Sequence, residues 1–160
     1  MKLSDKGKRL LMEWEGFKTE VYKDSAGLKT IGVGHLLTQQ ELSLYEIALD
    51  DESRVNFHDG LTDDQVLSLL ARDVRKFEQA MEQLVKVDLT QDQFDSLCSL
   101  IFNIGASNFA RSTMLKMINV SEFDKASDEF QKWNRAGGHE LPGLLKRRLA
   151  EAALFRGKVG

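Results

Sequence analysis

Apolar side chains recur at helical spacing along most of this chain, which predicts a mostly helical fold. Ser4 is a typical N-cap residue, and Leu10, Leu11 and Trp14 follow it at helical spacing. Gly16 then supplies the usual terminator, because glycine readily takes the left-handed conformation that ends many helices. We therefore expect a first helix from residue 4 to about residue 15.

Three short motifs mark further helix starts: TQQE from Thr38, TDDQ from Thr62 and TQDQ from Thr90. In each, the Thr hydroxyl and the Glu or Gln three residues later satisfy opposite backbone donors. The third motif opens a helix that is apolar all round after Asp95, so we expect it to be central and buried. Further helices are expected at about 112–119, 121–133 and 143–156. The second motif opens a long helix with the inner stripe Val66, Leu69, Leu70, Phe77, Met81 and Leu84.

One segment departs from the helical pattern. Val21 and Tyr22, the turn KDSAG and the segment LKTIGVGH predict a short β-hairpin. The sequence thus predicts a single α+β domain over residues 1–160. We expect an N-terminal lobe at about 1–60, a connecting helix at about 62–85 and a helical lobe at about 86–160, with a functional site in a cleft between the lobes.

Composition narrows the class of protein. A chain of 160 residues with 42% hydrophobic residues can bury a core, and its single Cys excludes an internal disulfide. The histidines His35, His58 and His139 are too scattered for a zinc motif, so we expect no metal and no cofactor. No apolar run approaches the roughly 18 residues of a membrane span, and LLM at 10–12 is too short for a signal peptide. We expect no membrane insertion.

Charge is unevenly distributed, although the net charge is only −3. Residues 31–130 carry 8 Lys or Arg and 18 Asp or Glu, whereas residues 131–160 carry 7 Lys or Arg and 2 Asp or Glu. The cationic C-terminal segment favours an anionic partner surface, because local fields steer encounter. A solvated basic helix is the alternative, and the sequence does not decide between them. We expect no nucleic-acid partner.

Glu15 is the first candidate for chemistry, because it closes the first helix directly after Trp14. The negative end of the helix dipole disfavours a carboxylate there by roughly 0.3–1 kcal/mol, and burial beside an indole acts in the same direction. Both effects favour the protonated form, which a general acid needs. A solvated Glu at a frayed helix end is the alternative.

Asp24 and Thr30 flank the turn of the predicted hairpin. Asp is common in turns, where it bonds its own backbone, but Thr30 on the return strand presents a hydroxyl near this carboxylate. Asp plus Thr can hold and deprotonate one water while a Glu opposite protonates a leaving group. Two carboxylates in distinct environments are the minimum equipment for glycoside hydrolysis. Gly32 and Gly34 either leave space for a bulky substrate or mark a strand bend.

The spacing of Glu15, Asp24 and Thr30, followed by TIGVGH, resembles the catalytic signature of phage-type lysozymes, the endolysins of glycoside hydrolase family 24. The segment LTQDQFDSLCSLIFNIG resembles the central helix of that family, and STMLKMIN resembles the helix after it. The C-terminal KWNRAGGHELPGLLKRRLAEAALF resembles a further family signature. The resemblance covers nearly the whole chain, least clearly residues 42–60, and implies a lysozyme-like fold.

The resemblance implies a bacteriolytic muramidase for host cell lysis, which hydrolyses the β-1,4 bond between N-acetylmuramic acid and N-acetylglucosamine in bacterial peptidoglycan. Carried over to this sequence, Glu15 is the general acid, Asp24 the base or water-positioning carboxylate, and Thr30 holds the water. Family enzymes of this spacing are regarded as inverting, so the two carboxyl groups should lie about 6.5–9.5 Å apart rather than about 5–5.5 Å. The resemblance also implies a monomer that stays in the host cytoplasm until a holin-type lesion releases it to the cell wall in the periplasm.

Supporting roles follow from the same resemblance. Leu36, Phe102 and Asn103 are expected to bind substrate, with core packing as the alternative for Leu36 and Phe102 and a helix C-cap for Asn103. Of the neighbours Arg147 and Arg148, the resemblance assigns Arg147 to orient Glu15 by an ion pair. Such a pair would lower the pKa of the carboxylate and oppose the effects of dipole and burial.

His35 and Asp73 are expected to form a structural pair. Asp73 follows Leu69 by four positions and precedes Phe77 by four, so it lies on the inward face of its helix and needs a partner. A charged pair would raise the pKa of His35. Cys98 lies mid-helix among apolar residues, where core packing rather than catalysis is expected.

Two other functions stay open at this point. A lytic transglycosylase would need the Glu but not the Asp base, and the presence of Asp24 with Thr30 argues against it. A non-enzymatic module would use the helices and the basic segment merely to bind the wall. Loss of wall clearing in a Glu15→Gln variant would separate the muramidase from that module.

Overall fold

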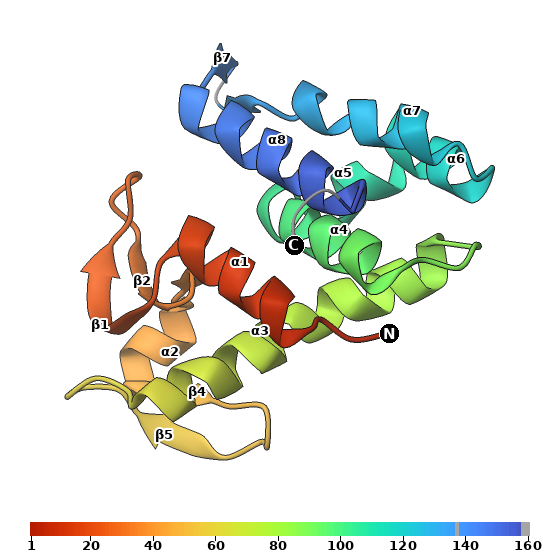
Figure 1. Ribbon diagram of the computed structural model, residues 1–160. Helices are drawn as coiled ribbons and strands as arrows, with labels where there is room; N and C mark the ends of the chain where they lie inside the picture. Colours follow the sequence, from red (N-terminus) through yellow and green to blue (C-terminus); the bar gives the residue numbers. More distant parts are fainter. Residues whose placement is uncertain (137, 158–160) are drawn as a thin grey trace. The chain divides into compact units, whose positions relative to one another are not determined.

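The computed structural model describes residues 1–136 and 138–157 (Figure 1). The chain divides into two compact units, here called the N-terminal unit (Lys8–Arg75) and the helical unit (Met1–Gly7 with Lys76–Gly160). Two helices cross the boundary, α1 (Asp5–Glu15) and the long α3 (Asp63–Leu84). The expectation of a mostly helical α+β fold is confirmed.

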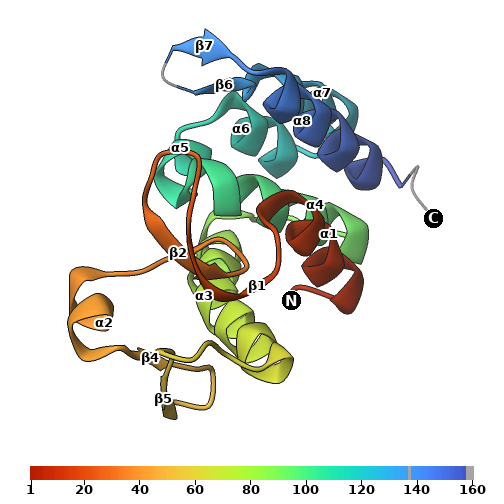
Figure 2. The same cartoon turned by 90° about the vertical axis from the view of Figure 1, so that its left-hand side faces the viewer.

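The N-terminal unit holds two small antiparallel sheets (Figure 2). One has the strand order β1-β2-β3, with β1 at Lys18–Lys23, β2 at Lys29–Gly32 and β3 at His35–Leu36. The short helix α2 (Gln39–Leu44) follows, and β4 (Glu46–Ala48) then pairs with β5 (Arg54–Asn56). The first half of α3 buries Val66, Leu69 and Leu70 within this unit. Packing against the apolar face of α3 therefore stabilises these sheets, which would be too small to be stable alone.

Local capping fixes the helix ends. The N–H of Gly7 donates to the Ser4 hydroxyl (3.1 Å), and α1 stops at Gly16, which has a φ of +87° and donates to the Met12 carbonyl (2.9 Å). All three expected capping boxes are present; around Thr62, for example, the Gln65 N–H donates to the Thr hydroxyl (3.1 Å) while the Thr62 N–H donates to the Gln65 side chain (2.9 Å). These contacts satisfy orphan backbone donors at each helix start.

The helical unit is built around α4 (Gln91–Ile104), in which every residue from Phe94 to Ile101 is buried. Helix α8 (Pro142–Phe155) packs along α4 (Figure 1). The prediction of a central buried helix is confirmed. The remaining elements of this unit are α5 (Ala106–Ala110), α6 (Thr113–Asn119), α7 (Phe123–Asp128), the 3-10 turn η1 (Phe130–Lys132) and the small hairpin of β6 (Arg135–Ala136) and β7 (His139–Glu140).

Several elements differ from the sequence-based expectation. Strands β3, β4 and β5 and helix α5 were not expected, because runs of two to five residues carry too little periodicity to predict. The helix expected at 121–133 begins at Phe123 and ends at Asp128, followed by the short η1 turn. Within the described residues, no helix is both long and apolar enough to span a membrane.

Candidate active site

Glu15 is the last residue of α1, and its carboxylate lies against the turn between β2 and β3. A Cβ atom on Gly34 would lie 2.8 Å from Glu15 Oε2 and 3.2 Å from Glu15 Cβ. Gly34 also has a φ of +64°, which L side chains rarely adopt. Glycine is therefore required here for two separate reasons. The space that the sequence suggested for a substrate is taken at this point by the half-buried Glu15 itself.

Asp24 holds the hairpin turn together. Its Oδ1 atom accepts the backbone N–H groups of Ala26 and Leu28, both at 2.9 Å. The backbone of Asp24 also bonds Leu28 and Gly27, each at 2.9 Å. Among the described residues, none donates a hydrogen bond to Oδ2 of this carboxylate. One oxygen therefore fixes the turn, while the other can still accept a hydrogen bond.

Thr30 sits at the centre of the three-stranded sheet. It pairs with Tyr22 on β1 and with Leu36 on β3, and directly opposed side chains face the same side of a sheet. Thr30 is only 2% exposed, and its hydroxyl donates to the Leu28 carbonyl (2.9 Å). Because a hydroxyl has one hydrogen and two lone pairs, this oxygen can still accept a hydrogen bond.

Tyr22 joins this group, although the sequence did not single it out. Burial raises the pKa of Tyr22, and the nearby charges of Glu15 and Asp24 raise it further. The phenol thus lies within electrostatic reach of both carboxylates. A signal was present in the sequence: Tyr22 precedes Asp24 by only two positions, at the end of the first predicted strand.

The sheet register therefore brings Thr30 and Tyr22 together on one face, and both carboxylates lie close enough to Tyr22 to raise its pKa. A family model described as phage lysozyme matches residues 12–151 of the chain, which include all four of these residues. The chain belongs to the phage lysozyme family.

Individual relatives match this phage lysozyme over nearly its full length. The endolysin of Acyrthosiphon pisum secondary endosymbiont phage 1 is 38% identical over 159 residues, which are 97% of this chain and 98% of that protein. The crystal structure of a P22 lysozyme mutant is 38% identical, with a TM-score of 0.79 and 98% of this chain and 99% of that chain covered. The endolysin from Escherichia coli O157:H7 phage FAHEc1 is 32% identical, with a TM-score of 0.81 over 99% of this chain and 96% of that chain.

As a phage lysozyme, the protein is a glycoside hydrolase, an endolysin that hydrolyses peptidoglycan for host lysis. The predictions of family, fold class and enzymatic function are confirmed. The non-enzymatic wall-binding alternative is set aside.

His35 of this phage lysozyme lies between two carboxylates. Its Nδ1 atom is 2.7 Å from Asp73 Oδ2, and its Nε2 atom is 3.0 Å from Glu41 Oε1. Burial lowers the pKa of His35, but hydrogen bonds and charges from Asp73 and Glu41 outweigh burial, so the net pKa is raised. Glu41 also accepts the Thr38 N–H (2.9 Å) in the capping box of α2. The imidazolium therefore ties β3 to both α2 and α3, with Glu41 as a partner that the sequence did not reveal.

The expected substrate-binding residues lie in both units. Leu36 is 51% exposed and lies on the same sheet face as Thr30. Phe102 packs its half-buried ring against Phe77, with centroids 5.5 Å apart. Asn103 is exposed, and its Oδ1 atom accepts from Arg148 (2.9 Å) rather than capping α4, which Gly105 ends. Their roles in substrate binding stay predictions.

Arg147 and Arg148 belong to a buried ionic cluster around Glu151. Arg147 Nε donates to Glu151 Oε2 (3.1 Å), and Arg148 Nε lies 2.6 Å from Glu151 Oε1. Arg147 also donates to the Ser99 carbonyl (2.9 Å), and the Ser99 hydroxyl donates to Glu151. The roles of Glu151 and Ser99 were not predicted, because their hydrogen bond joins α4 to α8 across 52 positions of the sequence. The proposed role of Arg147 toward Glu15 stays a prediction.

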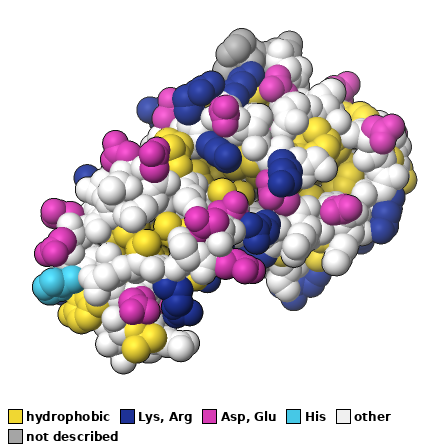
Figure 3. Space-filling view, turned by 90° about the horizontal axis from the view of Figure 1, so that it is seen from below, with side chains coloured by type: hydrophobic (Ala, Val, Ile, Leu, Met, Phe, Trp, Pro, Cys, Tyr) yellow, Lys and Arg dark blue, Asp and Glu magenta, His cyan; other side chains and the backbone are white. Residues whose placement is uncertain are grey.

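Many basic residues of the cationic C-terminal segment pair with acidic residues. Besides these two arginines, Arg156 pairs with Asp128 (2.7 Å), Arg135 with Glu140 (3.3 Å) and Lys132 with Glu129 (2.6 Å). On the face shown in Figure 3, basic and acidic side chains are interspersed. Several basic side chains of the segment therefore have acidic partners within the protein, and the expected surface for an anionic partner stays a prediction. No group of His, Cys, Asp and Glu in the described ranges could hold a metal ion.

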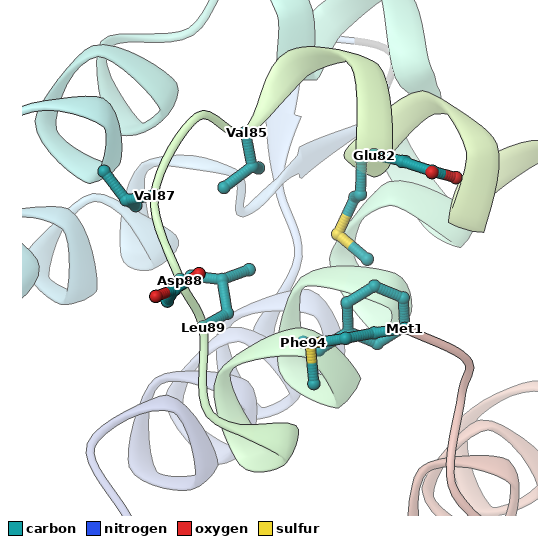
Figure 4. A pocket seen from close by; sticks show the side chains of 8 residues that line it. Met1, Glu82, Val85, Val87, Asp88, Leu89 and Phe94 are labelled. Carbon is teal, nitrogen blue, oxygen red and sulfur yellow. The ribbon is translucent and has the colours of Figure 1, made fainter.

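The helical unit contains a pocket. It has a volume of about 580 Å³ and is lined by Val85, Val87 and Leu89 from the loop between α3 and α4 and by Phe94 from α4. The side chains of Val85, Leu89 and Phe94 turn toward it (Figure 4). None of the candidate catalytic residues lines it. A second pocket, in the N-terminal unit, is lined by residues of the hairpin turn, β3 and α2.

Proposed function

We propose that this endolysin hydrolyses the β-1,4 bond between N-acetylmuramic acid and N-acetylglucosamine, with Glu15 as general acid and Asp24 as base. Thr30 holds the attacking water. The observation that carries the proposal is the register of the sheet, which aligns Thr30 with Tyr22, the residue whose pKa responds to both carboxylates. Two carboxylates around one hydroxyl fit glycoside hydrolysis better than a mechanism that uses the Glu alone.

The hydrogen bonds suggest how the water is held. The Thr30 hydrogen is directed to the Leu28 carbonyl, so its oxygen acts as an acceptor toward water. Asp24 Oδ1 is occupied by two backbone donors, so Oδ2 accepts the second water hydrogen. A water that donates to both groups directs a lone pair away from them, toward the sugar. As Asp24 takes the proton, that lone pair forms the new bond to the anomeric carbon.

Glu15 supplies the proton for the leaving sugar oxygen. Contact with the Gly34 backbone restrains its carboxylate, which reduces the cost of bringing the acid into line with the bond. The lysozyme then releases two chain ends, one of which carries a new reducing sugar. The reaction needs no cofactor in this scheme.

Clearing of a peptidoglycan suspension tests these roles. We expect Glu15→Gln to lose about 10³-fold or more of the activity while it keeps its fold, because amide cannot donate a proton to the leaving group. Mass spectrometry of the products should find hydrated reducing ends with muramic acid. Ends of the 1,6-anhydro type would instead identify a lytic transglycosylase, and clearing by Glu15→Gln at the wild-type rate would remove Glu15 from the mechanism.

The stereochemical outcome is a separate proposal. A water held by Asp24 on the face opposite Glu15 inverts the anomeric carbon. NMR spectra recorded in the first minutes of the reaction should therefore show the α-anomer of the new reducing end. Initial formation of the β-anomer would indicate a covalent intermediate on Asp24 and retention.

The remaining expectations from the sequence stay proposals. The enzyme acts as a monomer, and it waits in the host cytoplasm until a holin-type lesion forms. Sedimentation measures whether the protein is a monomer in solution. Expression in a host without a holin tests the route: we expect growth to continue until the membrane is permeabilised and lysis only then. Lysis without permeabilisation would indicate a different route.

A further inference from the structure

Three side chains form a row across the three-stranded sheet of the N-terminal unit. Thr30 on β2 is directly opposite Tyr22 on β1 and directly opposite Leu36 on β3, so the three side chains lie on the same face. Lys23 and Lys29 pair with each other one position further along, so they lie on the opposite face. The face that carries the proposed water-holding residue is therefore free of these two lysines.

The Tyr22 hydroxyl is the hydrogen-bond donor that this row leaves available. The Thr30 hydrogen is directed to the Leu28 carbonyl (2.9 Å), and Leu36 has no polar side-chain atom. In the part of the chain that the structure describes, no group forms a hydrogen bond with the Tyr22 hydroxyl. This phenol can therefore donate its hydrogen to a substrate without breaking a bond within the protein.

The charges around the phenol are negative. Burial raises the pKa of Tyr22, and the charges of Glu15 and Asp24 raise it further, so the phenol keeps its proton at neutral pH. An ionised carboxylate only accepts hydrogen bonds, and the Thr30 oxygen is likewise left as an acceptor. Apart from the proton that Glu15 gives to the leaving oxygen, the donor in this group of side chains is thus the phenol.

The sugar that is cut carries an acceptor at the matching place. The attacking water is aimed at the anomeric carbon, and in N-acetylmuramic acid the neighbouring ring carbon bears the acetamido group. The carbonyl oxygen of that group loses its hydrogen bonds to water when the sugar binds, which costs free energy unless a donor replaces them. A phenol beside the water-holding Thr30 supplies such a donor.

We propose that Tyr22 binds the acetamido group of the N-acetylmuramic acid at the scissile bond, with its hydroxyl donating to the acetyl carbonyl. The contact fixes the sugar ring relative to the attacking water, so the anomeric carbon is held in line for the reaction. This inference rests on the proposed function, because Thr30 and Asp24 set where the anomeric carbon lies.

A pair of substrates tests the contact: glycan strands with their natural N-acetyl groups, and strands that are first N-deacetylated and then N-trifluoroacetylated. Fluorine withdraws electrons from the carbonyl, so the second substrate is neutral and similar in shape but a weaker acceptor. We expect Tyr22→Phe to lower kcat/KM on the natural strands by about three- to tenfold, the effect of one neutral hydrogen bond. On the trifluoroacetylated strands the same change should have little effect.

Tyr45 offers a matched control, because it is the other tyrosine of the chain and lies 47% exposed at the end of α2. Tyr45→Phe should cut both substrates at the wild-type rate. If the Tyr22 hydroxyl acted only through the fold, its removal would lower cleavage of both substrates by the same factor, so an equal loss overturns the proposal. An unchanged kcat/KM on the natural strands overturns it as well. If the wild type releases no muramic acid reducing ends from natural strands, the proposed function has failed instead.

Binding without turnover provides a second measurement. A short glycan labelled with ¹³C at its acetyl carbonyls is added to Glu15→Gln and to the double variant Glu15→Gln/Tyr22→Phe. A carbonyl that accepts a hydrogen bond resonates further downfield, so one carbonyl signal should move downfield in the first complex and not in the second. The same shift in both complexes, or no shift in the first, would overturn the proposal.

Discussion

The Nδ1 atom of His35 lies 2.7 Å from Oδ2 of Asp73, and this contact joins the strand after the Gly34 turn to the middle of α3. Glu41 holds the other ring nitrogen at 3.0 Å. Since Gly34 supports Glu15 from the adjacent position, the imidazolium anchors the segment against which the proposed acid packs. The contribution of this imidazolium to the free energy of unfolding depends on pH.

We expect Asp73→Asn to lower the measured pKa of His35 and to cost about 1–3 kcal/mol of stability in weakly acidic solution. Because the folded pKa of His35 is raised above 6.5, its stabilisation is fully present below that pH and is lost as pH rises through the folded pKa. The destabilisation by Asp73→Asn should therefore shrink toward alkaline pH. NMR titration of His35 and urea unfolding across pH measure both effects.

Glu41 determines how the stability of the same contact changes at acidic pH. Burial raises the pKa of Glu41, but hydrogen bonds from Thr38 and the charge and hydrogen bond of His35 outweigh it, so the net pKa is lowered below 4.5. Its stabilisation is present above that pH and is lost as pH falls through the folded pKa. Asp59→Asn, at an exposed site, is the control and should follow the wild type at every pH. An unchanged His35 pKa in Asp73→Asn would contradict the ion pair.

The second prediction concerns Gly34→Ala. The new methyl group meets Glu15 Oε2 at 2.8 Å and also strains a backbone with a φ of +64°. We expect about 1–3 kcal/mol of lost stability and about 100-fold lower kcat/KM, because displacement of the acid by a fraction of an ångström weakens its alignment with the substrate. Unfolding and wall-clearing assays measure the two effects.

Gly105→Ala is the matched control for that variant. Gly105 has a φ of +90°, but nothing lies within 4 Å of an added Cβ. It should lose comparable stability and keep its kcat/KM. If the two variants lose activity equally, backbone strain alone accounts for the effect and the contact with Glu15 does not matter.

The buried cluster in the helical unit gives a third prediction. Glu151→Ala leaves Arg147 and Arg148 buried without their shared carboxylate, so we expect a loss of about 3–5 kcal/mol in the free energy of unfolding. Asp128→Ala breaks the Arg156 pair, whose carboxylate is 73% exposed, and should cost about 0–1 kcal/mol. Urea unfolding measures both losses. Equal losses of unfolding free energy in the two variants would mean that the buried cluster stabilises the protein no more than an exposed ion pair.

Thr30 provides the fourth prediction, which rests on the proposed mechanism. Thr30→Val keeps the shape of the side chain but removes the acceptor oxygen, so we expect kcat to fall about 100-fold with a stability change near 1 kcal/mol. Thr30→Ser keeps the hydroxyl and should retain most of the activity. If Thr30→Ser loses as much kcat as Thr30→Val, packing of the methyl group rather than the hydroxyl accounts for the loss.

Much of the local structure was predictable because the interactions that cause it are close in sequence. The capping boxes at Thr38, Thr62 and Thr90 each join residues three apart, and the left-handed stop at Gly16 depends on one backbone angle. The Asp24 turn is likewise closed within four residues. The sequence also indicated the family from the spacing of Glu15, Asp24 and Thr30, because these residues follow one another along a single helix and hairpin.

Other features depend on residues that are far apart in sequence and could not be inferred from periodicity. The short strands β4 and β5 have too few residues to show an alternating pattern. Ser4 caps α1, but its hydroxyl also donates to the buried Asp95, 91 positions away. The basic C-terminal segment suggested a charged surface, whereas packing of α8 on α4 buries Arg147 and Arg148 with Glu151.

The sequence by itself determined where most helices begin and end, which helix is buried, and which three residues carry the family's signature, because each is encoded within a few turns of chain. Only the tertiary structure decided that Glu15 rests on Gly34, that Glu41 is the second partner of His35, and that two arginines of α8 face inward. These contacts arise when elements pack, and a charged or polar group then takes whichever partner lies within hydrogen-bond distance. That choice depends on three-dimensional position, which local patterns along the chain do not contain.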